Sequence, residues 1–183
     1  MKNEGDDSKK EAGRGFAEIA DTIFAPVYPV IAGQILERTG IRSGRALDAG
    51  SGPGHLATAI ASRSDLVVHA LDCSPDMLGI CGRRVAELGL TGRVIPLTGD
   101  ISSIPLEDRS VDLVISRGSW FFWEDLPRAF SEIHRILKPG GETYIGGGFG
   151  SASLKEQVIA GMRSRNPDFQ SEITARMASR SPE

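Results

Sequence analysis

The sequence predicts an α/β fold in which a doubly wound, mostly parallel sheet is covered by helices on both faces. Apolar strand candidates alternate with helical patterns and are joined to them by short loops, which is typical of this fold class. The strand candidates are near-continuous apolar runs, as expected for a parallel sheet buried on both faces. A third observation is the segment 46–54, ALDAGSGPG, in which an apolar run ends at an aspartate and passes through three glycines before a helical pattern begins.

The elements are expected in the following order. Residues 16–24 have a helical pattern, and a second helix is expected at 29–39, where Gly40 is a residue that favours helix C-termini. Strands are expected at 45–48, 67–72, 94–98, 111–116 and 142–146. The remaining helices are expected at 54–63, 75–88, 126–137 and 154–163, with the segment 99–110 as a loop.

Length and composition are those of a soluble, single-domain protein. The 183 residues include 40% hydrophobic and 25% charged residues, and the net charge of −3 gives no sign of a nucleic-acid partner. No apolar run approaches the roughly 18 residues needed to cross a membrane. Cys73 and Cys81 have no metal-ligand spacing, so we expect reduced thiols, a cytoplasmic location and no metal. Residues 1–15 are charged and glycine-rich and are expected to form a disordered tail.

The glycine turn favours a ligand other than a dinucleotide. Glycine has no Cβ, so the backbone of this turn can approach a ligand closely. A dinucleotide fingerprint needs a third glycine where His55 stands. Pro53 lacks an N–H that could hold a phosphate, and the carboxylate of Asp48 would repel a pyrophosphate. A purely structural tight turn is the alternative at this stage.

Two further acidic residues follow neighbouring strands. Asp72 ends the second strand about twenty residues after the turn, where a carboxylate can accept the hydroxyls of a ribose. Asp100 follows the third strand and could accept a hydrogen bond from an exocyclic amine such as that of adenine, or could cap a turn through the serines that follow it. An adenosine with a positively charged amino-acid arm fits the acids at 48, 72 and 100 better than a phosphate does.

These residues resemble the motifs of class I S-adenosylmethionine-dependent methyltransferases of the small-molecule type. The similarity covers about residues 30–150, through segments 48–54, 71–78, 99–101, 104–106, 111–114 and 135–141. It implies a Rossmann-like fold, S-adenosylmethionine as cofactor with S-adenosylhomocysteine as product, and a small-molecule acceptor. The alternatives are a non-catalytic module of the same fold that binds the cofactor or a partner, and, more remotely, a dinucleotide enzyme.

The resemblance also implies roles for particular residues. The glycines pack under the methionyl arm, Asp48 helps hold its ammonium, Asp72 binds the ribose, and Ser116 lies beside the methionine moiety. Residues 73 and 77 flank the adenine, residues 100 and 101 read its edge, and Tyr28 touches the cofactor carboxylate. The complete set of expected cofactor-binding residues is Tyr28, Asp48, Gly50, Ser51, Gly52, Gly54, Asp72, Cys73, Met77, Gly99, Asp100, Ile101 and Ser116.

The sequence names no clear catalytic base. Methyl transfer is an in-line displacement that needs proximity and alignment, and it needs a base only if the acceptor must lose a proton. The weak candidates are His55, Arg117 and Trp120, and His55 is more simply a packing or capping residue. The aromatic stretch 120–123 is either an apolar wall for the acceptor, with Arg117 holding an anionic group, or a loop that plugs the edge of the core. The glycines at 146–150 could line the same pocket.

The C-terminal part departs from the resemblance. The related fold ends in an antiparallel hairpin beside the fifth strand, whereas residues after 150 have a helical and then a polar pattern. The expected domain therefore spans residues 16–165, followed by a polar segment at 166–183; the expectation is either a truncated chain or a partner that covers the fifth strand. Without the hairpin, the fifth strand would be an exposed edge, open to pairing in a homo-oligomer.

Overall fold

The computed structural model describes residue 15, residues 17–168, residue 171 and residues 174–175. Apart from residue 15, the tail expected at 1–15 lies outside the described residues, and the segment 166–183 is described only in part. The first described helical residues, 17–22, fall within the helix expected at 16–24.

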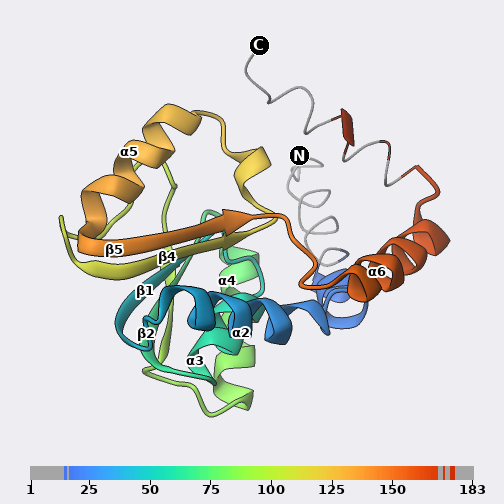
Figure 1. The fold of residues 1–183 in the computed structure, drawn as a ribbon, viewed down its shortest axis with the longest axis horizontal. Coiled ribbons are helices and arrows are strands. Elements are labelled where there is room, and N and C mark those ends of the chain that lie inside the picture. The colour runs from blue at the N-terminus through green and yellow to red at the C-terminus, as the bar shows by residue number, and fades with distance from the viewer. Residues whose placement is uncertain (1–14, 16, 169–170, 172–173, 176–183) are drawn as a thin grey trace, which may run out of the picture.

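A five-stranded parallel sheet forms the centre of the molecule, as predicted (Figure 1). The strands are β1 (Ser43–Ala49), β2 (Asp65–Asp72), β3 (Val94–Thr98), β4 (Val111–Arg117) and β5 (Leu137–Gly146). Their order across the sheet is β3-β2-β1-β4-β5, and every pair is parallel. The chain thus winds outward from β1 in one direction and returns to wind outward from β4 in the other, so the switch point lies between β1 and β4.

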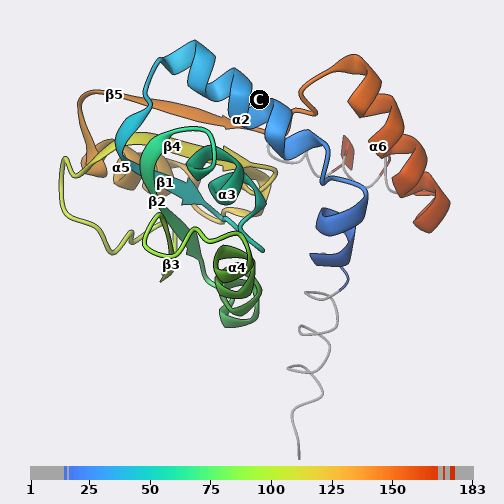
Figure 2. The same ribbon diagram turned by 90° about the horizontal axis from the view of Figure 1, so that it is seen from below.

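Helices cover both faces of this sheet (Figures 1 and 2). The helices α2 (Val27–Thr39), α3 (His55–Ala61) and α4 (Pro75–Glu87) lie on one face and α5 (Leu126–Ile136) on the other. Each face has its own buried apolar cluster: one joins side chains of α2, α3 and α4 to the sheet, and the other joins those of α5. The helix α6 (Ala152–Arg165) follows β5 and lies toward the carboxyl ends of the strands. The predicted fold class is confirmed.

Three helices begin at side-chain caps that the sequence encodes locally. Ser74 accepts a hydrogen bond from the backbone N–H of Met77, and Asp125 accepts one from that of Arg128 at 2.9 Å. Ser151 begins α6 in the same way. Each cap satisfies an N–H that the first helical turn would otherwise leave unpaired.

The expected boundaries of the helices and strands given above agree with the structure to within two residues, except that the start of β5 is wrong by five. Helix α2 begins at Val27 instead of residue 29, because Pro29 lies in its first turn, where a backbone N–H is not required. Strand β5 begins at Leu137, directly after α5, instead of residue 142. The register of β4 with β5 shifts between Val111 and Leu113, and Gly140 has a φ of 81° within the extra residues. A bulge of this kind interrupts the strand pattern that the sequence presents.

The expected loop at 99–110 is confirmed and is held against α5 by a compact polar network. The buried Glu132 accepts a hydrogen bond from the backbone N–H of Ile104 at 2.9 Å and pairs with Arg135. Arg135 in turn donates to the carbonyl groups of Ile104 and Leu106. The loop between β3 and β4 is therefore fixed against the last turns of α5.

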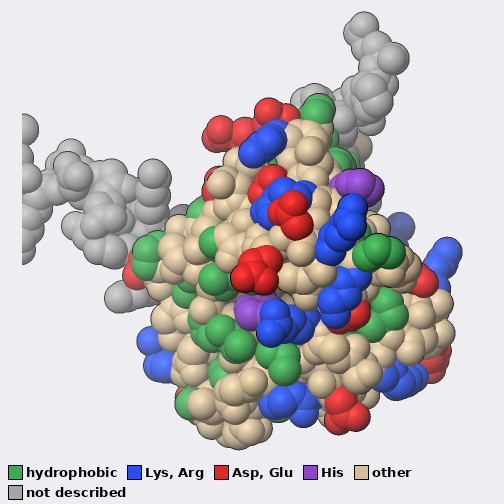
Figure 3. Space-filling view, turned by 90° about the vertical axis from the view of Figure 1, so that its left-hand side faces the viewer, with side chains coloured by type: hydrophobic (Ala, Val, Ile, Leu, Met, Phe, Trp, Pro, Cys, Tyr) green, Lys and Arg blue, Asp and Glu red, His purple; other side chains and the backbone are tan. Residues whose placement is uncertain are grey.

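The opposite end of the sheet has a mixed surface (Figure 3). Positive and negative side chains are interspersed there, including the pairs Arg135–Asp108 and Lys138–Asp112. Within the described ranges, no helix is long and apolar enough to cross a membrane. The same part of the chain contains no cluster of three side chains suited to hold a metal ion.

Candidate cofactor and acceptor site

The glycine turn joins β1 to α3 at the carboxyl end of the sheet. Gly50, Gly52 and Gly54 have φ values of 71°, 52° and 82°, which are left-handed conformations that side chains with a Cβ rarely adopt. The backbone N–H groups of Gly50 and Ser51 both donate to the carbonyl of Leu71, at 2.9 and 2.8 Å. The turn is therefore tied to the end of β2, and the predicted strand–turn–helix unit is confirmed.

Gly50 also permits close contact with a residue that the sequence analysis did not single out. A Cβ at Gly50 would lie 2.6 Å from the side chain of Ser119. The Ser119 hydroxyl donates to the carbonyl of Ala49 at 2.8 Å and shares a hydrogen bond with Ser116 at 2.6 Å. Ser119 thus connects the ends of β1 and β4, and the only signal for it in the sequence is a small residue between a glycine and the aromatic stretch.

Packing against α4 explains why a glycine is needed at position 54. A Cβ there would lie 2.4 Å from the sulfur of Cys81, a buried residue of α4. This contact lets α3 and α4 pack closely just behind the turn.

Asp48 is a buried carboxylate beneath the turn. Its exposed fraction is 2%, and it accepts a hydrogen bond from the backbone N–H of Ala57 at 3.0 Å. Burial raises the pKa of Asp48 to about 7, and the nearby charge of Asp72 acts in the same direction. A carboxylate in this environment is stabilised in its ionised form by a cation, and no described side chain supplies one in an ion pair with it.

Asp72 is held at the end of β2 by two backbone groups. One carboxylate oxygen accepts from the N–H of Gly52 at 2.8 Å and the other from the N–H of Ser74 at 2.9 Å. Each oxygen can accept a further hydrogen bond. Asp72 is therefore oriented by the turn and has the remaining capacity to accept two hydroxyl groups.

The residues expected around the adenine follow β2 and β3 and differ in burial. Cys73 is exposed, whereas Met77 is 7% exposed and Ile101 packs partly against the core. Asp100 is exposed and accepts from both the backbone and the hydroxyl of Ser102, which is the turn-capping role that the sequence left open. Both bonds go to Oδ1, and Oδ2 has no hydrogen bond among the described residues.

Gly99, which precedes this aspartate, is tightly packed. A Cβ there would lie 2.8 Å from the ring of Pro105 and 2.9 Å from the side chain of Leu71. Its small size therefore has a packing cause in the structure, whichever ligand binds nearby.

His55 begins α3 and is 8% exposed. Its Nε2 lies 2.9 Å from Oδ1 of Asp21, and its ring stacks on Tyr28 with the centroids 4.7 Å apart. Burial, followed by the charge of Arg84, lowers the pKa of His55 to about 4, so the ring is neutral at pH 7. When the neutral ring donates Nε2–H to Asp21, Nδ1 is left as a hydrogen-bond acceptor.

Two buried side-chain atoms among the described residues have no hydrogen-bond partner: Nδ1 of His55 and Oγ of Ser51. Both belong to the segment that contains the glycine turn. Buried polar atoms are ordinarily paired, so an unpaired couple at this one place indicates a site for a polar ligand or an ordered water.

The turn is also held from the N-terminal side, which sequence reasoning did not detect. Asp21, among the helical residues 17–22, pairs with Arg84 of α4 as well as with His55. Arg84 also donates from Nε to the carbonyl of Pro53 at 3.0 Å. Asp21 and Arg84 thus bracket the turn from two elements, and no local motif marks either residue.

The aromatic stretch 120–123 largely serves the core. Residues Trp120–Phe122 form a single 3₁₀ turn, η1, after which Trp123 is 6% exposed. Phe121 is also buried, Trp120 packs partly against the α5 side of the core, and Phe122 is 56% exposed. The interpretation of this stretch as a plug of the core edge is therefore confirmed for Phe121 and Trp123.

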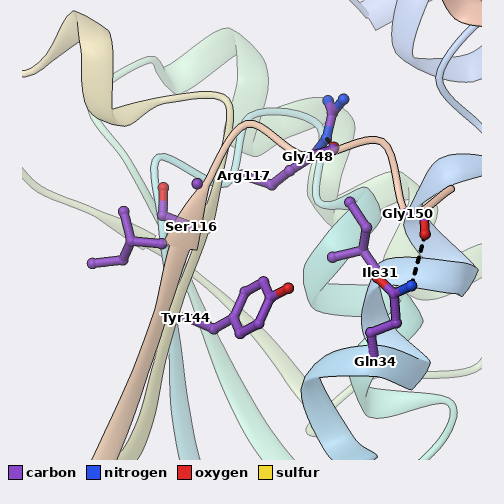
Figure 4. Close-up of a pocket in the computed structure, with 9 residues that line it drawn as sticks. Ile31, Gln34, Ser116, Arg117, Tyr144, Gly148 and Gly150 are labelled. Carbon is purple, nitrogen blue, oxygen red and sulfur yellow. Dashed lines mark hydrogen bonds between the residues drawn. The ribbon is translucent and has the colours of Figure 1, made fainter. Parts of the chain in front are cut away.

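A small pocket lies at the carboxyl ends of β4 and β5, beneath α2 (Figure 4). Its volume is about 180 Å³, and it is lined by Ile31, Gln34, Ser116, Arg117, Tyr144, Ile145, Gly146, Gly148 and Gly150. Glycines of the cluster after β5 line this pocket together with Arg117, as expected, whereas none of the aromatic residues 120–123 expected to form its wall lines it. Gln34 closes one side by donating to the carbonyl of Gly150 at 2.7 Å.

The residues around the turn fit S-adenosylmethionine. Asp48 offers a buried negative charge to a cation, Asp72 offers two oriented oxygens to a ribose, and the unpaired atoms of Ser51 and His55 lie in the same turn. A pyrophosphate would instead meet two carboxylates and no cation on the turn itself.

Comparison with known proteins agrees with this chemistry. Residues 47–145, more than half of the chain, match the family model described as a methyltransferase domain. A protein of known structure from Methanococcus maripaludis, described as an S-adenosyl-L-methionine-dependent methyltransferase, is 48% identical, with a TM-score of 0.87 over 88% of this chain and 74% of that one.

Curated relatives match a shorter part. An uncharacterised methyltransferase of Mycobacterium tuberculosis is 38% identical over 97 residues, 53% of this chain and 37% of its own length. The malonyl-[acyl-carrier protein] O-methyltransferase of Methylococcus capsulatus is 37% identical over 117 residues, 63% of this chain and 41% of its own length. The chain thus spans about two fifths of the length of these relatives. The fold, the glycine turn with Asp48 and Asp72, and these similarities together show that the chain belongs to the S-adenosylmethionine-dependent methyltransferase family.

Proposed function

We propose that this protein transfers a methyl group from S-adenosylmethionine to a small-molecule acceptor. The observation that carries the proposal is that two carboxylates, Asp48 and Asp72, are both oriented at the glycine turn by backbone N–H groups. Asp48 suits the cationic amino-acid arm and Asp72 the ribose. The remaining expected cofactor residues belong to the same proposal; among them, Tyr28 stacks on His55 and Ser116 bonds to Ser119 beside the turn.

The bound cofactor supplies a methyl group on a sulfonium centre, which is already a good leaving group. The protein's task is therefore to align the two reactants and exclude water. The Ser116–Ser119–Ala49 hydrogen bonds fix the ends of β4 and β1 relative to each other. His55 is neutral at pH 7, but its unpaired Nδ1 is buried, so we assign it to orienting the turn rather than to proton removal.

A small acceptor is supported by the size of the pocket at β4 and β5. Its volume of about 180 Å³ is below the range of typical drug-sized ligand sites, which is about 300–1,000 Å³. The name of the Methylococcus capsulatus relative states malonyl-[acyl-carrier protein] as its acceptor, in which the group itself is small but is carried on a protein.

The proposed unit comprises residues 16–165. The cysteines at 73 and 81 form no disulfide, which supports a location in the reducing cytoplasm. Among the described residues, β5 pairs with β4 alone, so its other edge is open to pairing in a homo-oligomer.

Calorimetry with S-adenosylmethionine, S-adenosylhomocysteine and NAD tests the cofactor assignment. We expect both adenosyl compounds to bind and NAD to bind at least tenfold more weakly. Tighter binding of NAD would contradict the proposal. Formation of S-adenosylhomocysteine is then measured with a panel of small acids, alcohols and amines; binding without turnover on any of them would favour a non-catalytic module.

A further inference from the structure

The pocket at β4 and β5 contains one charged side chain, Arg117. Figure 4 shows its stem along the wall and its guanidinium at the rim near Gly148, while the Tyr144 ring and Gln34 border the interior. No acidic residue lines the pocket. The local charge is therefore positive.

The guanidinium is held mainly by aromatic faces. Its central carbon lies 4.5 Å from the ring centroid of Phe24, 5.5 Å from that of Tyr28 and 5.7 Å from that of Phe149. Nε donates to the carbonyl of Gly148 at 3.2 Å. These contacts position the group without neutralising it.

Arg117 forms no ion pair with a described carboxylate, unlike Arg84, which pairs with one, and Arg135, which pairs with two. A guanidinium has five N–H donors in a planar fork that matches a carboxylate in two-point contact. A half-buried arginine with spare donors and no ion pair to a described carboxylate is an incomplete arrangement, which an anionic ligand would complete.

The pocket lies farther along the sheet than the three acids expected to hold the cofactor, and Ser116 borders both sites. Across the sheet, Asp100 follows β3, Asp72 ends β2, Asp48 lies in β1, and Arg117 ends β4 next to the edge strand. The acids proposed to hold adenine, ribose and ammonium thus occupy successive strands. The pocket adjoins them at β4 and β5, so a molecule bound there would lie next to the methionine moiety proposed at Ser116.

We propose that Arg117 selects an acceptor that carries a carboxylate, with the carboxylate bound by the guanidinium at the rim and the remainder of the molecule in the pocket below. The inference rests on the proposed function. It names the acceptor class as small organic acids. Neutral acceptors of the same shape lack the group that pairs with Arg117.

The test compares benzoate with its neutral analogue benzamide, each titrated by NMR into the protein saturated with S-adenosylhomocysteine. We expect benzoate to bind at least tenfold more tightly than benzamide. The Arg117→Gln variant should lose this tenfold preference while its affinity for S-adenosylhomocysteine changes less than twofold. The matched control is Arg38→Gln, an exposed arginine on α2, which should keep the full preference.

Arg117→Lys provides a second variant that keeps the charge, in case the glutamine variant does not fold. It should bind benzoate three- to tenfold more weakly, because an ammonium lacks the two-point fork; unchanged affinity would count against the proposal. Equal binding of benzoate and benzamide by the natural protein would overturn it.

A third comparison separates the two carboxylates. If Arg117→Gln weakened S-adenosylhomocysteine tenfold but left 5′-methylthioadenosine, which has no carboxylate, unaffected, Arg117 would hold the cofactor and the proposal would be wrong. Failure of S-adenosylhomocysteine to bind the natural protein would overturn the proposed function as well. Binding of S-adenosylhomocysteine without a preference for benzoate would overturn this inference alone.

Discussion

Asp48 shows how burial at a single residue prepares a site for a charged ligand. Its carboxylate is almost fully buried and has one backbone donor in the described structure. The pKa of about 7 means that, near neutral pH, the ligand-free protein is divided between the protonated and ionised forms. A cation beside the carboxylate favours the ionised form, so ligand binding and proton release are linked.

The first prediction concerns pH. Because folding raises the pKa of Asp48 above its unfolded value of 3.8, the folded state keeps a proton that the unfolded state releases, and stability falls as pH rises from about 4 to about 7. Binding of S-adenosylmethionine should release a proton in this range and strengthen as pH rises toward 7. Calorimetry in buffers of different ionisation enthalpy measures the proton release.

Asp48→Asn is the corresponding variant. It should abolish the proton release and lower the affinity for the cofactor more than tenfold. Its free energy of unfolding at pH 8 should equal or exceed that of the natural protein. Undiminished proton release in the variant would show that another group is responsible.

The second prediction concerns Asp72. Asp72→Ala removes both the proposed ribose acceptor and the anchor of the Gly52 and Ser74 N–H groups, and should weaken cofactor binding by about 1–3 kcal/mol. Asp72→Asn keeps one oxygen acceptor and should lose less. Comparison of adenosine with 2′,3′-dideoxyadenosine separates the two roles, because only the ribose role depends on the hydroxyls; an equal loss for both ligands would contradict it.

At the scale of elements, the contact of α3 with α4 shows why the third glycine of the turn is required. Gly54 is both the left-handed N-cap of α3 and the point where Cys81 approaches from α4. The α3 helix has seven residues, all of them buried, so its position depends on packing more than on its own helical stability.

The third prediction follows from this contact. Gly54→Ala should lower the free energy of unfolding by about 2–4 kcal/mol, since it adds backbone strain and a clash with the Cys81 sulfur. Adding Cys81→Ala to this variant should relieve the clash but leave the backbone strain. Urea denaturation of the two single variants and the double variant measures the coupling free energy between the two positions. Gly82→Ala, in the same helix α4 with no atom within 4 Å, is the control and should be neutral or slightly stabilising. Additive single effects would contradict the contact.

At the scale of the whole molecule, the two ends of the described chain meet over the carboxyl ends of the strands. Arg165 of α6 pairs with Glu18 at 2.8 Å, and Gly161 lies against Ile23. Asp21 then joins this N-terminal part to the start of α3 through His55. Elements outside the region of the family match therefore help to form the site.

The fourth prediction tests this connection. Asp21→Asn removes the negative charge that Arg84 and His55 share, and should speed hydrogen exchange of residues 17–22 and weaken binding of S-adenosylhomocysteine three- to tenfold. Glu18→Gln, which removes a more exposed pair with Arg165, is the control and should change cofactor affinity less than twofold. Equal effects of the two variants would contradict a specific role for Asp21.

Local sequence patterns located most elements, because a strand, a helix or a turn is largely encoded by neighbouring residues. They misplaced the start of β5, because residues 138–141 form a bulge between the pairs Val111–Leu137 and Leu113–Glu142 and present no apolar run. They also left Asp100 open between ligand binding and capping, because both roles use the same carboxylate at the same position. The contact with Ser102 is now established, and the adenine role stays a prediction.

The sequence by itself determined the order of strands and helices along the chain, the glycine turn, and the placement of Asp48 and Asp72 at the ends of two successive strands. Parallel strands bring their carboxyl ends to one edge, so these acids converge by topology alone. Only the tertiary structure decided that Ser119 and Asp21 close around the turn, through contacts between residues 70 and 34 positions apart. Such contacts depend on packing between distant segments, which no local period or spacing encodes, and the aromatic enclosure of Arg117 arises in the same way.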